Sequence, residues 1–463
     1  MSVLFFPRRG AAALSCLFFC CLCASLSAGD LPVRRIADDS SLRMEIKDTW
    51  LTEVPARVLG KRPMIRTLNS GGRIQVRTEE GRTEFAVVLA REWNGDRESL
   101  ALVQRQTGAA WPGWTQGSWS LSRLKSTGEA LRIRIFLRSD PNAYIQFRPF
   151  TADKCFMDVI LWEAYLVDSL PFPVPFERLY TLPVEETLAL VGNRFPRRYF
   201  EPNPDDYEDT RRFIAAVRER LPELSFRDDG AIDENGRYVF IESLGEQDGK
   251  GGLNCSGFAK WLVDGILRPV TGERLAVGPL KRRFGDRGSS FTEIWEETRD
   301  PFFGLDWIRN LASCVWTGLR GESYGTLEEF EVRRRPFSRT IVREHSAGSP
   351  RSYPGYLENA GFGIEGLQPL LYTLAVDEPG RIYLAAVNAE TGPPATADNL
   401  RGRPRMRQYF HVAALVPYFN RYGNFQIAVF ESAEETRFNN FRARYPGHYV
   451  NLVRIPVERI FNP

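Results

Sequence analysis

The feature that most limits the fold is the period of the hydrophobic pattern, which changes from two to a helical spacing near residue 200 and returns to two toward the C-terminus. Up to about Gly192, apolar and polar residues alternate in short runs, and Gly, Pro, Asn and Asp fall between the runs. The runs are residues 73–77 (RIQVR), 84–89 (EFAVVL), 131–137 (LRIRIFL), 144–147 (YIQF) and 155–162 (CFMDVILW). Alternation with period two is typical of strands that bury one face. Residues 30–192 are therefore expected to form a β-rich accessory domain, sandwich-like in architecture.

A proline-rich connector, from Pro171 to Pro204, ends this pattern. Apolar residues then recur at helical spacing at Phe213, Val217 and Leu221. Strand patterns return near the end, in residues 382–387 (IYLAAV), 411–419 (HVAALVPYF), 425–431 (FQIAVFE) and 449–457 (YVNLVRIPV). Helices followed by strands predict a second domain of the α+β class over residues 200–463. Within it, residues 270–352 form a stretch rich in Arg, Gly and aromatic residues.

The charge balance excludes one class of partner. The 463 residues carry 61 Lys and Arg against 58 Asp and Glu, a formal net charge of +3. A nucleic-acid-binding protein needs a basic surface, so DNA and RNA are not expected as partners. Hydrophobic residues make up 43% and charged residues 26%, the mixture of a chain that folds into globular domains.

The first 28 residues have the layout of a secretory signal peptide. Arg8 and Arg9 precede the uncharged residues 11–26, and small residues follow at positions 27–29. The protein is therefore expected to be exported, to the periplasm or the cell envelope. Membrane attachment through an uncleaved signal or through a lipid is the weaker alternative. The lipid could be carried by one of four cysteines: Cys16, Cys20, Cys21 and Cys23.

The cysteines beyond the signal segment are odd in number. They are Cys155, Cys255 and Cys314, so at least one thiol is free where disulfides can form. No pair has zinc spacing, and no metal site and no cofactor are expected. Cys155 and Cys314 lie in apolar runs typical of buried residues.

Cys255 lies in a different context from the other two. Residues 251–262 read GGLNCSGFAKWL, which predicts a helix that begins near the cysteine, after two glycines and a polar capping residue. The partial positive charge at a helix N-terminus stabilises a thiolate and lowers its pKa. Ser256 is small and leaves the sulfur accessible, and backbone N–H groups at this turn could hold an oxyanion.

A thiol nucleophile needs a base, and His411 opens a predicted strand. If residues 420–423 form the turn of a hairpin, His411 faces residues near 432. Glu431 is the nearest carboxylate that could orient the imidazole, although a one-residue slip would turn it to the other face, and Gln426 is the alternative if the register or strand geometry differs. His448 is a reserve base, whereas His345 is expected in a loop.

These residues resemble the nucleophile motif of the NlpC-type cell-wall cysteine peptidases, which have a compact papain-like fold. The family's Asp-Cys-Ser-Gly followed by an apolar helix matches residues 251–266 (GGLNCSGFAKWLVDGI), with Asn254 in place of Asp. Residues 379–387 (PGRIYLAAV) and 411–416 (HVAALV) look like the family's later strands. The resemblance covers residues 238–456, with residues 270–352 as a long insertion. It implies that Tyr238 lies near the oxyanion.

The resemblance implies an exported cysteine hydrolase that cleaves an amide bond in the stem peptides of peptidoglycan. The bond could be a γ-D-glutamyl bond to a diamino acid or the amide that joins the stem to the glycan. The alternative is a catalytically inactive envelope protein that binds wall peptide or another envelope protein. A second open question concerns Trp111, Trp114 and Trp119, which could form an aromatic platform for sugar or peptide or pack in a hairpin corner.

Overall fold

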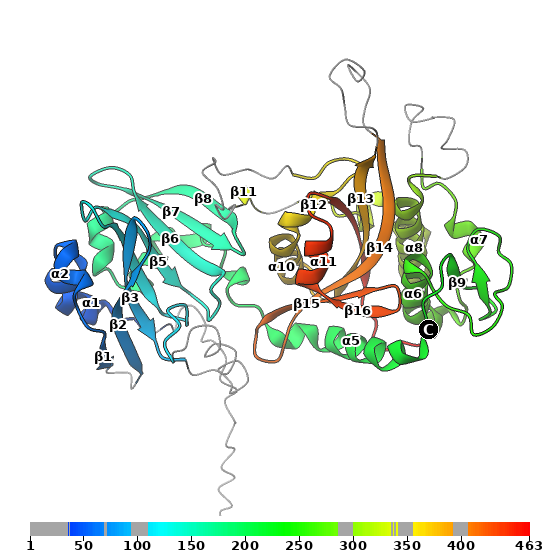
Figure 1. Cartoon of the computed structure of the whole chain (residues 1–463), viewed down its shortest axis with the longest axis horizontal. Coiled ribbons are helices and arrows are strands. Elements are labelled where there is room, and N and C mark those ends of the chain that lie inside the picture. Colours follow the sequence, from blue (N-terminus) through cyan, green and yellow to red (C-terminus); the bar gives the residue numbers. More distant parts are fainter. Residues whose placement is uncertain are drawn as a thin grey trace, which may run out of the picture.

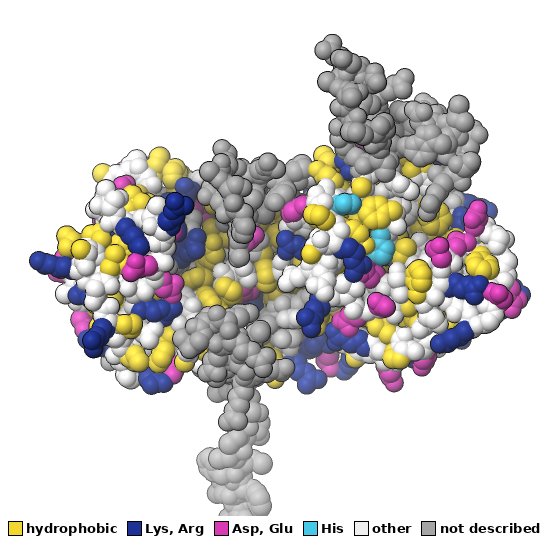
Figure 2. Space-filling view, in the orientation of Figure 1, with side chains coloured by type: hydrophobic (Ala, Val, Ile, Leu, Met, Phe, Trp, Pro, Cys, Tyr) yellow, Lys and Arg dark blue, Asp and Glu magenta, His cyan; other side chains and the backbone are white. Residues whose placement is uncertain are grey.

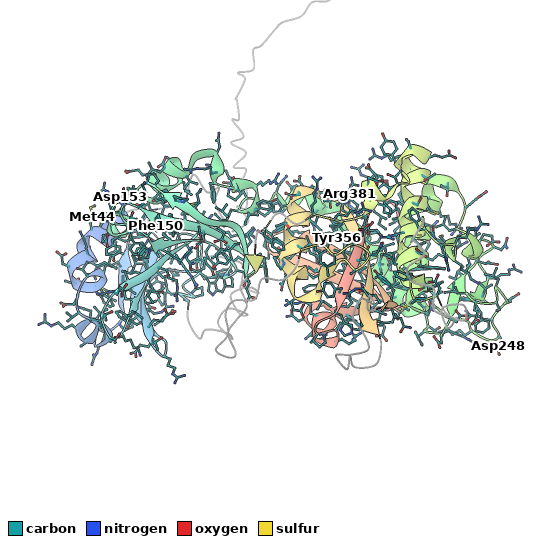
Figure 3. The ribbon with its side chains drawn as sticks, turned by 90° about the horizontal axis from the view of Figure 1, so that it is seen from above. Met44, Phe150, Asp153, Asp248, Tyr356 and Arg381 are labelled. Carbon is teal, nitrogen blue, oxygen red and sulfur yellow. The ribbon has the colours of Figure 1, made fainter. Side chains whose placement is uncertain are left out.

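The computed structural model is a mixed α+β protein with two regions that lie side by side along its long axis (Figure 1). It describes residues 36, 38–68, 72–93, 110–285, 300–334, 337, 339–340, 355–391 and 406–463. The expected signal peptide, residues 1–28, lies outside the described residues. Seen from above, Met44 and Phe150 belong to one region and Asp248 marks the far end of the other (Figure 3). No helix of the described residues is both long enough and apolar enough to span a membrane.

The N-terminal region is built on one nine-stranded antiparallel sheet in which strands β1 to β8 follow their order in the sequence. The strands are β1 (Met64–Thr67), β2 (Arg73–Glu80), β3 (Glu84–Arg91), β4 (Trp119–Leu124), β5 (Ala130–Phe136), β6 (Ala143–Pro149), β7 (Cys155–Leu161), β8 (Ala164–Phe172) and β11 (Arg339–Thr340). Each predicted run coincides with one of these strands, whereas β1, β4 and β8 carry weaker alternation. All nine strands belong to this one sheet. The layer that packs against it is therefore not a second sheet, which a sandwich-like architecture would require.

Helical segments supply that second layer. They are α1 (Ser40–Ile46), η2 (Lys47–Leu51), α2 (Pro55–Leu59), η3 (Phe176–Tyr180) and α4 (Val184–Val191). Leu42 and Trp50 of this layer share one hydrophobic cluster with Ile133 and Phe147 of the sheet. The sheet therefore buries one apolar face against helices, and its strands present the polar half of their alternation on the opposite face.

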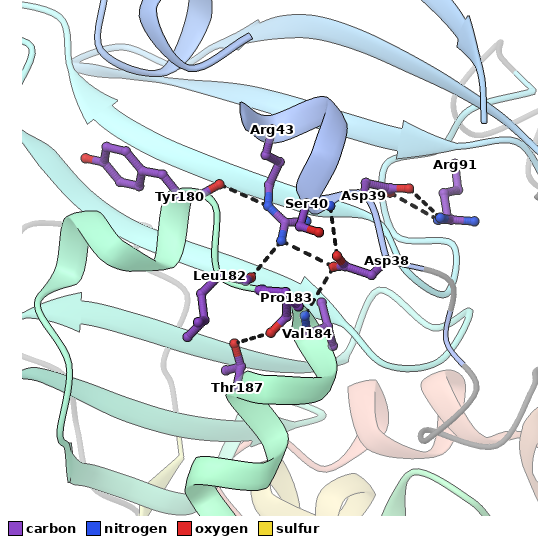
Figure 4. A network of polar contacts seen from close by, with 10 residues as sticks. All are labelled: Asp38, Asp39, Ser40, Arg43, Arg91, Tyr180, Leu182, Pro183, Val184 and Thr187. Atoms are coloured by element: carbon purple, nitrogen blue, oxygen red, sulfur yellow. Dashed lines mark hydrogen bonds and ion pairs between the residues drawn. The ribbon is translucent and has the colours of Figure 1, made fainter. Parts of the chain in front are cut away.

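A buried arginine fixes α1 to the segment that follows the sheet. The Arg43 side chain is 1% exposed, and its Nε and Nη2 donate to the carbonyl oxygens of Tyr180 (3.0 Å) and Leu182 (2.8 Å) (Figure 4). Asp38 balances the charge at 3.2 Å and accepts the Val184 N–H at 3.1 Å. A buried charge is tolerated only when it is paired and hydrogen-bonded, and this network meets both conditions.

The C-terminal region is built on a six-stranded antiparallel sheet with the order β12, β17, β13, β14, β15, β16. Its strands are β12 (Phe362–Gly363), β13 (Arg381–Thr391), β14 (Met406–Phe419), β15 (Phe425–Glu431), β16 (Glu434–Arg437) and β17 (Tyr449–Pro456). A small hairpin of β9 (Gly230–Ile232) and β10 (Tyr238–Phe240) lies apart from this sheet. The four predicted C-terminal strands correspond to β13, β14, β15 and β17.

Helices cover both faces of the second sheet (Figure 1). The helical segments are η4 (Gly192–Arg194), η5 (Arg197–Tyr199), η6 (Pro204–Tyr207), α5 (Glu208–Arg220), η7 (Leu221–Glu223), α6 (Cys255–Thr271), α7 (Val277–Leu280), α8 (Phe303–Arg320), η9 (Glu322–Tyr324), α9 (Leu327–Phe330), η10 (Ile364–Gly366), α10 (Leu367–Asp377) and α11 (Phe438–Arg444). Helices α6 and α8 pack on one face, where Val412 and Ala414 are buried. The other face, with Ala413 and Leu415, packs against α10 and α11.

Helix α8 lies within the stretch that the sequence suggested to be an insertion, yet it belongs to the core. Its Leu305, Ile308 and Leu311 are 0–1% exposed, and the Trp307 Nε1–H donates to the carbonyl oxygen of Ser256 at 2.9 Å. The helix thereby supports the first turn of α6 from behind.

The two regions share one hydrophobic cluster, which runs from the N-terminal sheet through the connector to α10. Polar contacts reinforce the junction. Arg138 of the N-terminal region donates to the Tyr372 hydroxyl at 2.8 Å and to the Gly423 carbonyl oxygen. Tyr199 of the connector donates to Asp377 at 2.9 Å. The regions are therefore joined by packed side chains as well as by the chain itself.

Candidate active site

Local chemistry at residues 254–257 places Cys255 at the N-terminus of α6. The Asn254 side chain accepts the Gly257 N–H at 2.8 Å, which satisfies one of the unpaired donors of the first turn. Gly257 allows the helix end to approach β9, because a Cβ there would lie 2.0 Å from the Gly230 carbonyl oxygen. No acceptor in the described part of the chain is bonded to the backbone N–H of Cys255 or Ser256. Two donors therefore remain available beside the sulfur.

The residues before the cysteine fix the approach to the helix and place Tyr238 away from the sulfur. Gly251 has φ of +72°, and a Cβ at this position would lie 2.4 Å from the Tyr238 ring. The Tyr238 ring therefore packs on the glycine, and Tyr238 does not line the cavity in which Cys255 lies. The structure thus does not support Tyr238 as an oxyanion-binding residue, whereas Ser256 does line the cavity.

A β-bulge orients His411 near the start of the regular part of β14. His411 pairs with Val387 of β13, but the next pair is Asn388 with Tyr409, so Phe410 is the extra residue. Tyr409 consequently belongs to the same hydrophobic cluster as Val412 and does not share the face of His411. The imidazole lies just beyond the last pair of β14 with β15, beside the N-terminus of α6.

The hairpin register brings Glu431 to the same face. Phe430 pairs with Ala414, so Glu431 lies beside Ala413 and points the same way as His411, two residues earlier. The observed register is one residue away from the expected one, because the turn is centred on Tyr422. The Glu431 Oε2 lies 2.6 Å from His411 Nε2. With Nε2 engaged, the other ring nitrogen is the one that can bond the sulfur.

Cys255 and His411 are hydrogen-bonded and shift each other's pKa. Burial alone would raise the pKa of the Cys255 thiol, but the bond and charge of His411, the Val412 N–H and the Ser256 hydroxyl lower it below the ordinary value. Burial lowers the pKa of His411, but bonds to Cys255 and Glu431 raise it to about 9. Both shifts favour a thiolate beside an imidazolium near neutral pH.

Arg444 completes the environment of Glu431 and was not indicated by the sequence. Glu431 is 3% exposed, and Arg444 Nη1 lies 2.9 Å from its Oε1. Burial would raise the pKa of Glu431, but bonds to His411 and Thr436 and the charges of His411 and Arg444 lower it. The carboxylate is therefore held ionised by one cation on each oxygen. The Tyr445 ring lies 5.7 Å from that of His411 and covers it.

Cys255, Ser256 and His411 line a cavity of about 730 Å³. Its wall includes the aromatic side chains of Phe226, Phe303 and Phe410. The charged lining residues of the described chain are four acids and one base: Asp228, Asp229, Glu242, Asp300 and Lys281. Figure 2 shows histidine side chains among hydrophobic ones on the surface of the C-terminal region. The cavity therefore offers an open approach to the sulfur through an acidic and aromatic surface, within the size range of about 300–1,000 Å³ typical of ligand sites.

The remaining candidates lie elsewhere. Gln426 pairs with Tyr418 and lines a separate cavity with Arg218 and Glu435, so it does not contact His411. His448 is close to the site without reaching the thiol: its ring is 5.6 Å from that of Phe410, and its Nδ1 contacts the Pro446 carbonyl oxygen. His345 lies outside the described residues.

The other two thiols lack these features. Cys155 is buried in β7, where desolvation and the charge of Glu177 raise its pKa to about 12. Cys314 lies on α8, and burial raises its pKa as well. Among the described residues, no three His, Cys, Asp or Glu side chains form a group that could hold a metal ion.

The comparisons with known proteins concern the other half of the molecule. Residues 32–199 match the model of a family described as a domain of unknown function (DUF8515). No curated protein and no solved structure matches the chain at a significant level. The family model spans β1 to β8 and most of the connector and ends before α6, so the N-terminal sheet region is similar to a family domain of unknown function.

Proposed function

We propose that the protein is an exported cysteine hydrolase of NlpC type, with a papain-like arrangement in its C-terminal region, that cleaves an amide bond in peptidoglycan stem peptides. The observation that carries the proposal is the chain of contacts from Cys255 through His411 to Glu431 at the wall of an open cavity. A nucleophile, a base and an orienting carboxylate, each next to the following one in space, are the groups that acyl transfer by a thiol requires. The periplasm or cell envelope is the proposed location.

The mechanism follows from the protonation states. The Cys255 thiolate attacks the amide carbon, and the resulting oxyanion accepts hydrogen bonds from the backbone N–H groups of Cys255 and Ser256. The His411 imidazolium gives its proton to the leaving nitrogen, the C–N bond breaks, and a thioester remains. His411 then takes a proton from water, the hydroxide attacks the thioester, and the carboxylic acid leaves as the thiolate forms again. Glu431 stabilises the imidazolium throughout.

The electrostatics of the cavity support a substrate with free amino groups. Four carboxylates line the described wall against one lysine, Lys281, whose Nζ donates to the Glu242 carbonyl oxygen at 2.7 Å. An acidic, partly desolvated wall attracts cationic groups. The diamino acid of a stem peptide carries such a group, and the aromatic side chains can pack on its aliphatic part.

The test is a digest of defined muropeptides by the mature protein, analysed by mass spectrometry. We expect peptide release that Cys255→Ala and His411→Ala each lower by at least about 1,000-fold, because each removes a member of a unit that acts together. Cys314→Ala is the matched control and should retain full release. Release retained by Cys255→Ala, with unchanged thermal unfolding, would refute the mechanism.

A further inference from the structure

The outward face of the N-terminal sheet carries a second groove that the proposed hydrolysis does not use. A row of paired residues crosses strands β3 to β6 there: Val88 lies opposite Ser120, Ser120 opposite Arg134, and Arg134 opposite Gln146. Opposed residues of an antiparallel sheet point to the same side. The row therefore presents a hydroxyl, a guanidinium and an amide on one surface.

Small side chains hollow this surface. Ala86, Ser120 and Ser122 lie next to the larger Arg132 and Arg134, and the backbone of Gly113 closes one side. The resulting cavity is about 340 Å³, at the lower end of the range for small-molecule sites. Trp114 and Phe136 stand at its rim and belong to a separate hydrophobic cluster on this face. Of the three tryptophans singled out in the sequence, Trp119 is buried in the core and Trp114 faces the groove.

Among the residues that the structure describes, the charged side chains that line the groove are paired except for one. Glu79 is bonded to Arg77, Glu80 lies 2.8 Å from Lys125, and Glu84 is paired with Arg132. Arg134, by contrast, forms no ion pair with any carboxylate of the described residues. Its guanidinium lies 4.6 Å from the centre of the Tyr144 ring, and its Nε donates to Gln146 at 3.0 Å.

Arg134 is thus held in place by groups that do not neutralise it. Burial lowers its pKa, but an arginine stays charged throughout the physiological range. Neither Nη of Arg134 is hydrogen-bonded to any group in the described part of the chain, so both can donate to a ligand. A guanidinium with free donors in a partly desolvated groove fits a carboxylate, which it can bind through two hydrogen bonds.

We propose that this groove binds a saccharide unit that carries a carboxylate. The carboxylate bonds to Arg134, ring hydroxyls bond to Ser120, Ser122 and the Glu84 carboxylate, and the apolar face of the sugar ring packs on Trp114. An aromatic rim with hydroxyl, amide and charged groups inside suits a ligand that has both an apolar face and many hydroxyls. This inference goes beyond the proposed function, because it concerns binding by another region and requires no catalysis.

The test measures binding by isothermal titration calorimetry to the mature Cys255→Ala protein, which cannot turn over a substrate. The probes are N-acetylmuramic acid, whose pyranose ring carries a lactyl carboxylate, N-acetylglucosamine, which has the same ring without it, and D-lactate, which has the carboxylate without the ring. We expect N-acetylmuramic acid to bind at least about 10-fold more tightly than either of the others.

Variants assign the binding to the groove. Arg134→Gln should weaken binding of N-acetylmuramic acid at least about 10-fold, and Ser120→Leu, which fills the hollow, should abolish it. Arg66→Gln, on β1 of the same sheet and away from the groove, is the matched control and should bind as before. Far-ultraviolet circular dichroism and thermal unfolding verify that each variant is folded.

Several outcomes would overturn the proposal. Equal affinity for N-acetylmuramic acid and N-acetylglucosamine would show that Arg134 does not recognise the carboxylate. Equal affinity for N-acetylmuramic acid and D-lactate would show that the groove binds a carboxylate without contacting the sugar ring. Unchanged binding in folded Arg134→Gln, or no binding of N-acetylmuramic acid at millimolar concentration, would equally contradict it. Because the measurement uses a variant without the nucleophile, failure of hydrolysis does not influence the result.

Discussion

The two grooves of this molecule are assembled in opposite ways. The groove on the N-terminal sheet is made by residues between 79 and 136, on strands that follow one another in the chain. The active-site cavity is made by segments near residues 228, 255, 300, 411 and 432, which the packing of α6 against β9, α8 and β14 brings together. In the first groove, strands that are adjacent in the sequence are also adjacent in space. The catalytic contacts, by contrast, join elements that are distant in the sequence.

The chemical difference between the regions is equally clear at their cysteines. Cys155 lies within a strand, surrounded by apolar side chains, while Cys255 lies at a helix end beside an imidazole. The same side chain thus has a raised pKa in one sheet and a lowered pKa next to the other. The following predictions test this contrast, beginning with the largest effect.

Thiol reactivity should separate the two regions most strongly. At pH 7 we expect iodoacetamide to modify Cys255 at least about 100-fold faster than Cys155 and Cys314, because the thiolate is the nucleophile and only Cys255 has a lowered pKa. Mass mapping of alkylated peptides over time measures the three rates in one sample. His411→Ala should bring the rate at Cys255 close to that of an ordinary thiol. Similar alkylation rates at all three cysteines would show that the two regions do not differ in thiol reactivity.

Removal of the Glu431 charge should alter the pH dependence of hydrolysis. The imidazolium of His411 must be present to protonate the leaving nitrogen, so activity falls as pH rises through its pKa of about 9. Glu431 stabilises the charged form; Glu431→Gln should therefore lower that pKa and move the alkaline limb to lower pH. We also expect kcat to fall about 10- to 100-fold as the ring loses its orienting partner. The pH profile of kcat/KM measures the shift.

Arg444→Met should shift the alkaline limb less than Glu431→Gln and in the opposite direction, because it removes a positive charge near the imidazolium and leaves the Glu431 carboxylate bonded to His411. Arg442→Met is the matched control, because Arg442 lies on the same helix and bonds to Gln368 instead. An alkaline limb that stays in place in Glu431→Gln would show that the carboxylate does not set the histidine pKa.

The helix cap should give the smallest effect. Asn254→Ala removes the acceptor of the Gly257 N–H and should lower the free energy of unfolding by about 0.5–2 kcal/mol, measured by urea denaturation. Asn254→Asp keeps an acceptor and should retain stability. Its negative charge next to the sulfur should, however, raise the pKa of Cys255 and shift alkylation to higher pH. Equal stability of Asn254→Ala and the parent protein would contradict the capping role.

The features that could be predicted from the sequence are those set by local chemistry. Helix α6 begins at Cys255 because Asn254 caps it and Gly257 permits the close approach, and both residues lie within two positions of the cysteine in the sequence. The strands of alternating residues were also recognisable, since one face is buried and the other is not. The mixed α+β class follows from these two patterns.

Other parts depend on distances that no local pattern encodes. A hairpin loop one residue longer than expected sets the register that turns Glu431 toward His411. Arg444 comes close only because the short helix α11 folds back over β15, and its composition carries no sign of this contact. The groove at Arg134 likewise depends on which of several arginines forms no ion pair with a carboxylate. That depends on which side chains meet in the folded protein.

The extra residue at Phe410 has a consequence for engineering. The alternation of side chains between the two faces of the sheet shifts by one residue at Phe410. The direction of the His411 side chain is therefore set by the part of β14 that follows Phe410. A change of sequence or length upstream of Phe410 should therefore leave the imidazole aimed at the sulfur. Variants with new substrate ranges can be sought by changing Gln408, which lies upstream of Phe410 and lines the cavity, while the reacting groups stay untouched.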